Sequence, residues 1–389
     1  MTLYKKFAIF SNFILLFCVL IDPTNILFHF KDIAFLVFIA INLPFAKFDR
    51  IWILLIFLAG YGFCFSLGTF FSESLDLART FAYLKSFLFL FYIFWMNDSE
   101  LFTIKFFYYL CILICLIEIF ILGFLNFTPF RIWFLDFNYE KDYWLLIANR
   151  TFIGLRFNMI YFRTSSCCVL ALGLAFVRFF NTKKIKYLIH ILILFMGLVI
   201  SGTRANILSA LLIIFSLFLF WTFFEKKATF FFTSFMCVFF LLVCIVVFLL
   251  LNQEGDFSLN IKQLHIKSYK HLFISNPLKF FFRGMGPGGN FYSEGFKAIT
   301  SLTELSYLDL IKDFGVLVTC VFIFLFVFPA FQVLHNNYNS SFEKSCLVVP
   351  YLAYLFIAGT NPLLMSSTGF IVYAVFINLS DKKIEEINY

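Results

Sequence analysis

The chain has 389 residues, of which 62% are hydrophobic, 23% aromatic and only 13% charged. A soluble globular protein carries roughly 25% charged residues, so this composition excludes that class and indicates a polytopic membrane protein. The formal net charge of +8 would favour nucleic-acid binding in a soluble protein. Here we interpret it as loop charge that sets orientation in the membrane, and we expect no nucleic-acid partner.

Apolar runs recur along the whole chain. A membrane-spanning helix needs about 20 mostly apolar residues. Because some of the runs are short, we predict an all-α integral membrane protein with about 12 transmembrane helices (10–12), forming one polytopic domain over residues 1–389. The candidate spans are 7–21, 33–48, 51–67, 81–97, 101–123, 159–180, 187–201, 205–224, 229–251, 305–330, 346–358 and 362–379.

The positions of Lys and Arg predict how the helices cross. Short cytoplasmic loops are rich in these residues, which places the N-terminus and C-terminus of this chain in the cytoplasm. Two long loops, 124–158 and 252–304, then lie on the outer face of the membrane. Long loops in a compact domain are usually functional. The cytoplasmic cations are Lys47, Arg50, Arg178, Lys183, Lys184, Lys186, Lys226, Lys227, Lys344, Lys382 and Lys383.

The second long loop begins with an amphipathic pattern. Apolar residues from Ile261 to Phe273 recur at helical spacing, which predicts a helix at the membrane surface that ends at Asn276-Pro277. The segment FRGMGPGG that follows contains Gly284 and Gly286, whose free backbone N–H groups could surround an anion. The alternative interpretation of this segment is a flexible turn.

Charged residues continue into the next apolar run. Glu304 stands at its beginning, and Asp309, Lys312 and Asp313 follow on one helical face. Charges within a spanning helix cost several kcal/mol unless they face protein or water, so they indicate a functional site. The alternative is that their side chains extend to the membrane interface.

The first long loop is rich in aromatic residues and arginine. Aromatic faces suit sugar rings, and they are equally typical of the membrane interface. Arg156 and Arg163 lie near its end, and Arg is well suited to phosphate because its planar guanidinium binds two oxygens at once. We also expect Lys85 and Glu118 to pair inside the bundle. Neither the histidines nor the cysteines have metal-ligand spacing, so we predict no metal site.

Three segments resemble the shared domain of O-antigen polymerases (Wzy-type) and O-antigen ligases, within residues 190–330. SGTRANILSALLIIF (201–215) resembles the Arg-bearing segment that opens that domain. YKHLFISNPLKFFFRGMGPG (269–288) resembles its outer loop, and ELSYLDLIKDFGVLVTCVFIF (304–324) resembles its closing span. The earlier spans resemble the family only in number and character.

The resemblance implies a glycosyltransferase of the bacterial inner membrane whose active site faces the periplasm. An O-antigen polymerase transfers the growing glycan from undecaprenyl diphosphate onto the next lipid-linked repeat unit, for lipopolysaccharide biosynthesis. Such chemistry needs a base and cations around the departing diphosphate. The expected catalytic residues are Glu304, as the base, and Arg204. The expected diphosphate-binding residues are Arg283, Arg156 or Arg163, Lys270, Gly284 and Gly286, with Asp309 and Lys312 in support.

One departure favours polymerase over ligase, because ligases typically have His-Asn near the position of Thr303-Glu304 here. O-antigen ligase, which transfers glycan to lipid A-core, remains an alternative. A lipid-linked glycan flippase or transporter is an alternative of another class, although no repeated halves are evident. We expect no cofactor. The expected partners are the lipid-linked oligosaccharides, membrane lipid and a chain-length regulator protein.

Overall fold

The structure is a computed structural model that describes residues 3–95, 100–125, 128–141, 144–152, 155–225, 257–337, 339–380 and 382. The protein is mostly helical, as the sequence predicts, because apolar helices satisfy their backbone groups internally where lipid cannot. Eight helical segments in the described part of the chain are long and apolar enough to cross a membrane. They are Leu3–Ile21, Ile51–Phe70, Leu77–Phe94, Thr103–Phe124, Ser165–Thr182, Arg204–Thr222, Ser306–His335 and Ser341–Gly359.

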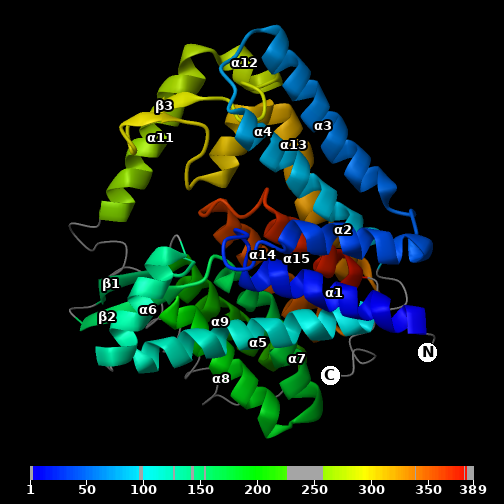
Figure 1. Cartoon of the computed structure of the whole chain (residues 1–389). Coiled ribbons are helices and arrows are strands. Elements are labelled where there is room, and N and C mark those ends of the chain that lie inside the picture. Colours follow the sequence, from blue (N-terminus) through cyan, green and yellow to red (C-terminus); the bar gives the residue numbers. More distant parts are fainter. Residues whose placement is uncertain are drawn as a thin grey trace.

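Figure 1 shows the arrangement of the described elements. The α-helices are α1 (Leu3–Ile21), α2 (Lys31–Asn42), α3 (Ile51–Phe70), α4 (Leu77–Leu88), α5 (Glu100–Phe124), α6 (Thr128–Glu140), α7 (Cys168–Thr182), α8 (Ile185–Ile200), α9 (Arg204–Glu225), α11 (Phe257–Ser275), α12 (Pro277–Phe282), α13 (Ser306–His335), α14 (Ser341–Gly359) and α15 (Ser367–Leu379). The 3-10 helices are η1 (Leu43–Phe45), η2 (Phe89–Trp95) and η3 (Ser165–Cys167). The strands are β1 (Leu146–Phe152), β2 (Leu155–Tyr161), β3 (Phe291–Ser293) and β4 (Ala298–Thr300).

Several predicted spans correspond to helices that are short for a membrane crossing. The run 33–48 forms the 12-residue α2 followed by η1, which is too short to cross a membrane alone. The predicted spans 187–201 and 362–379 correspond to α8 and α15, with 16 and 13 residues. The predicted span 229–251 lies outside the described residues.

The first long loop contains regular structure that the sequence analysis did not anticipate. Helix α6 is followed by an antiparallel hairpin in which β1 pairs with β2, from Leu146 opposite Tyr161 to Phe152 opposite Leu155. The predicted span 159–180 therefore begins too early, because its first residues belong to β2 and the apolar helical segment starts at Ser165. In β2, polar residues such as Asn158 alternate with apolar residues, which suits a strand with two different faces.

The second long loop folds back onto the rest of the protein. The predicted amphipathic helix is α11, which ends at Ser275 immediately before Asn276-Pro277, as expected. Tyr269, Phe280, Met285 and Phe291 form a hydrophobic cluster of their own, separate from the main core. This cluster gives the loop a fixed shape next to α13.

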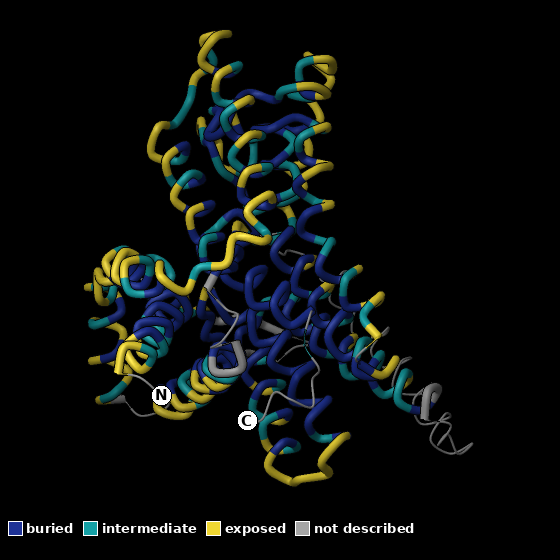
Figure 2. The backbone as a smooth tube through the Cα atoms, turned by 90° about the vertical axis from the view of Figure 1, so that its right-hand side faces the viewer, coloured by how far each residue is buried: buried dark blue, intermediate teal, exposed yellow. Residues whose placement is uncertain are grey.

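Helix α13 has a kink at Gly315, whose φ of 73° is unfavourable for any other residue. A Cβ at this position would lie 2.7 Å from the backbone nitrogen of Arg283, so glycine also permits the close approach of the second loop. Figure 2 shows buried residues gathered where the helices cross and exposed residues along the outer edges.

The predicted pair between Lys85 and Glu118 is wrong. Lys85 pairs with Asp32 at 2.6 Å, between α4 and α2. Glu118 is fully buried and instead accepts a 2.5 Å hydrogen bond from the hydroxyl of Ser165.

Candidate functional site

A buried ion pair lies near the start of α13. Lys312 and Asp313 are both fully buried, and the Lys312 Nζ lies 2.5 Å from Asp313 Oδ1. Lys312 also donates to the carbonyl oxygens of Gly289 at 2.6 Å and Ser301 at 3.1 Å. Asp313 accepts a 2.8 Å hydrogen bond from the hydroxyl of Tyr83 in α4. A buried charge pair is tolerated when further hydrogen bonds satisfy both partners, and these contacts do so.

Asp309, one turn earlier in α13, is bonded to the second loop. Its Oδ1 accepts a 2.6 Å hydrogen bond from the hydroxyl of Tyr269 in α11, and its Oδ2 accepts from the backbone and hydroxyl of Thr303 at 3.1 Å each. Burial raises the pKa of Tyr269, and the negative charge of Asp309 raises it further. The phenol therefore remains protonated and serves as the donor.

These six residues, Tyr83, Tyr269, Thr303, Asp309, Lys312 and Asp313, are called the buried polar network below. The alternative in which the α13 charges extend to the membrane interface does not hold for them, because Asp309, Lys312 and Asp313 are at most 2% exposed. The network joins α4, α11 and α13, and its member Thr303 immediately precedes Glu304 in the sequence.

Helix α4 supplies polar contacts that the sequence analysis did not assign. Asp76 caps this helix and accepts a 2.8 Å hydrogen bond from Ser301. That bond, together with the N–H of Arg79, holds the pKa of Asp76 below its usual range. The Arg79 guanidinium lies 4.4 Å from the centre of the Tyr83 ring. Asp76, Arg79 and Tyr83 are spaced by three and four residues, so the sequence did contain the signal that they share a helix face.

The glycine-rich segment packs closely against other parts of the protein. The N–H of Gly284 donates to Lys279, that of Met285 to Lys312, and that of Gly286 to Asp313. Gly284 has a φ of +64°, and a Cβ there would lie 2.5 Å from the Lys312 carbonyl oxygen. The expectation that these N–H groups are free to surround an anion is therefore wrong for Gly284 and Gly286.

Glu304 follows the network and remains accessible. Its side chain is 45% exposed, and its Oε2 lies 3.5 Å from the Nζ of Lys262 in α11. One turn further along α11 is the buried His265, whose Nδ1 lies 2.7 Å from the hydroxyl oxygen of Ser293. Burial lowers the pKa of His265, the charge of Glu304 opposes this effect, and Lys262 adds to it. The Glu304 carboxylate thus lies near the Lys262 ammonium group on one side and is accessible to solvent on the other.

The end of β2 lies within electrostatic range of Glu304. Burial raises the pKa of Tyr161, the positive charge of Arg163 opposes the rise, and the negative charge of Glu304 adds to it. Arg163 itself is exposed. The charges of Glu304 and Arg163, which are separated by 141 positions in the sequence, thus both act on the Tyr161 phenol.

Arg204 begins α9 after the turn that the sequence predicted between two apolar runs. The side chain of Asn206 donates to Ser201 at 2.9 Å and so stabilises the turn. Gly202 packs against β2, since a Cβ there would lie 2.4 Å from that of Met159. Arg156 belongs to the same strand, where it is paired with Thr151.

Arg283 and Lys270 are the remaining expected diphosphate-binding side chains. The Arg283 guanidinium lies 3.3 Å from the Glu73 carboxylate and 3.9 Å from the centre of the Phe71 ring. In Figure 1, α12, which ends next to Arg283, lies at the top of the molecule, whereas α9 lies in its lower part. Lys270 is exposed on α11. The structure therefore separates Arg283 from the helix that Arg204 begins.

Among the residues that the structure describes, no three His, Cys, Asp or Glu side chains gather as possible metal ligands. Glu304 itself is a part-exposed carboxylate near the ammonium group of Lys262. No protein-family model, no curated protein and no solved structure matches the chain.

Proposed function

We propose that the chain is a membrane glycosyltransferase of the O-antigen polymerase type, with Glu304 as the general base. The observation that carries the proposal is the setting of Glu304. It is a part-exposed carboxylate, 3.5 Å from the Nζ of Lys262, directly after a segment fixed by the buried polar network. A general base must have a defined position and must still be reached by substrate.

In the proposed reaction, Glu304 takes the proton from an acceptor sugar hydroxyl of one lipid-linked repeat unit. The hydroxyl oxygen forms a bond to the anomeric carbon of the growing glycan. The bond from that carbon to the diphosphate breaks, and undecaprenyl diphosphate leaves with the electron pair. Arg163 and Arg204 stabilise the charge that develops on the departing diphosphate.

The arrangement of the elements supports a reaction on one face of the membrane. The start of α1 lies at the right of the molecule in Figure 1, whereas β1, β2 and α11 of the two long loops lie at the left. With a cytoplasmic N-terminus, the proposed reaction at Glu304 takes place on the periplasmic side of the inner membrane. Undecaprenyl-linked substrates would then enter from within the bilayer.

Arg283, Gly284 and Gly286 receive a different role in this proposal. Arg283 and Lys279 both contact Glu73, at 3.3 and 2.7 Å, and so hold the second loop against the end of α3. The glycines permit the loop to approach α13. These residues position the loop, while Arg163 and Arg204 contact the substrate.

Deletion of the gene, followed by electrophoresis of the lipopolysaccharide, tests the proposal. A polymerase deletion leaves core that carries a single repeat unit. Bare core with accumulated lipid-linked polymer would instead identify a ligase. An unchanged pattern would exclude both activities.

A further inference from the structure

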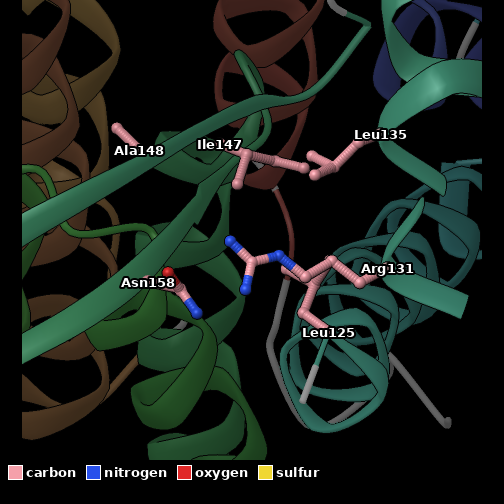
Figure 3. Close-up of a pocket in the computed structure, with 6 residues that line it drawn as sticks. All are labelled: Leu125, Arg131, Leu135, Ile147, Ala148 and Asn158. Atoms are coloured by element: carbon pink, nitrogen blue, oxygen red, sulfur yellow. The ribbon is translucent and has the colours of Figure 1, made fainter. Parts of the chain in front are cut away.

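An open cavity of about 190 Å³ lies between α6 and the β1-β2 hairpin. Its lining is largely apolar, with two polar side chains. Figure 3 shows the Arg131 guanidinium extending from α6 into the space between Ile147 and Asn158. The lining residues are Leu125, Arg131, Leu135, Ile147, Ala148 and Asn158.

Arg131 brings an uncompensated positive charge to this cavity. Within the described part of the chain, its guanidinium forms no hydrogen bond or ion pair. Arg131 is exposed, so its guanidinium is free to meet a ligand, and guanidinium binds phosphate oxygens through two parallel hydrogen bonds. Asn158, on the facing strand, can donate a further hydrogen bond. We propose that this cavity binds the phosphate of an anionic membrane lipid.

The surface of α6 favours a lipid as the source of the phosphate. Ile132 and Trp133 are each 59% exposed, and Tyr139 is 68% exposed. Trp and Tyr are enriched at membrane interfaces, where an apolar ring meets the headgroups. A helix with such a surface lies in the headgroup region, so Arg131 would meet lipid phosphates at the same depth.

The cavity is separate from the proposed catalytic residues. Successive side chains of a strand point to opposite faces, so Asn158 and Met159 face opposite ways. Asn158 lines the cavity, whereas Met159 contacts Gly202 in the turn before Arg204. The hairpin thus presents one face to the lipid phosphate and the other to the proposed active site.

Native mass spectrometry of the full-length protein in detergent tests the lipid site without a glycosyltransferase assay. The result is therefore independent of the proposed reaction. The probes are dioleoylphosphatidylglycerol, dioleoylphosphatidylcholine and inorganic phosphate. The variant is Arg131→Gln, and Lys141→Gln, at the end of the same helix, is the control for loss of one charge.

We expect the native protein to bind phosphatidylglycerol about tenfold more tightly than phosphatidylcholine, and Arg131→Gln to remove this preference while Lys141→Gln retains it. Displacement by millimolar inorganic phosphate would identify a site that also takes free anions, whereas resistance to displacement would show that the lipid is required. Both results support recognition of an anionic phosphate headgroup, which phosphatidylcholine does not supply because its choline cation balances the phosphate. Equal binding of the two lipids by the native protein, or equal effects of the two substitutions, would overturn it. Asn158→Leu provides a second test if Arg131→Gln does not fold.

Discussion

Tyr269 of α11 donates a 2.6 Å hydrogen bond to Asp309 of α13. This contact connects the helix of the second long loop with the span that carries the buried charges Asp309, Lys312 and Asp313. Because Thr303 contacts the same carboxylate, the position of Glu304 depends on this bond.

Tyr269→Phe should reduce stability. The substitution removes a hydrogen bond to a buried carboxylate, which costs about 1.5–3 kcal/mol. Thermal unfolding of the purified protein in detergent measures the effect. Tyr292→Phe is the matched control, because Tyr292 is 59% exposed and contributes no described hydrogen bond from its phenol. Equal melting temperatures for the two variants would contradict the role given to Tyr269.

Lys312→Met should be more severe, because it leaves Asp313 buried without its cation. Removing one member of a buried ion pair costs about 3–5 kcal/mol. The double variant Lys312→Met/Asp313→Leu should recover part of the loss, since no charge then remains unpaired. The yield of monodisperse protein and its melting temperature report both effects. A double variant no more stable than Lys312→Met would show that the cost comes from packing and not from charge.

Gly284→Ala should displace the second loop from α13. Glycine is needed there both for its positive φ and because a Cβ would lie 2.5 Å from the carbonyl oxygen of Lys312. We expect faster proteolysis within the loop 277–303. Gly62→Ala in α3 is the control, since a Cβ there has nothing within 4 Å. Similar proteolysis of the two variants would argue against the close approach of loop and helix.

His265 should make stability depend on pH. Burial lowers its pKa in the folded protein, so the unfolded chain binds the proton more readily. The stabilising effect of the neutral ring is present above about pH 6.5, the unfolded value, and is lost as the pH falls through the folded pKa. His265→Asn should therefore flatten the decline in melting temperature between about pH 7.5 and 5.5. His271→Asn, at an exposed position of the same helix, should leave the decline unchanged.

The sequence predicts the helical membrane fold and the face shared by Asp309, Lys312 and Asp313, because both follow from local periodicity. It also locates the turn before Arg204 and the end of α11. It does not reveal the contact between Tyr83 and Asp313, which joins residues 230 positions apart. The hairpin at 146–161 was missed because its apolar residues resemble the start of a span. Arg283 was placed with substrate because its ion pair with Glu73 depends on tertiary structure.

The most direct test of the central claim is chain elongation by purified protein supplied with undecaprenyl-diphosphate-linked repeat units. Glu304→Gln should reduce the elongation rate by about 10²–10⁴-fold, which is the usual contribution of a general base, while the variant remains folded. Glu294→Gln is the matched control, because Glu294 is also paired with a lysine of α11, Lys267, at 3.0 Å. It should elongate at nearly the native rate. Near-native elongation by Glu304→Gln, or no elongation by the native protein, would contradict the proposed function.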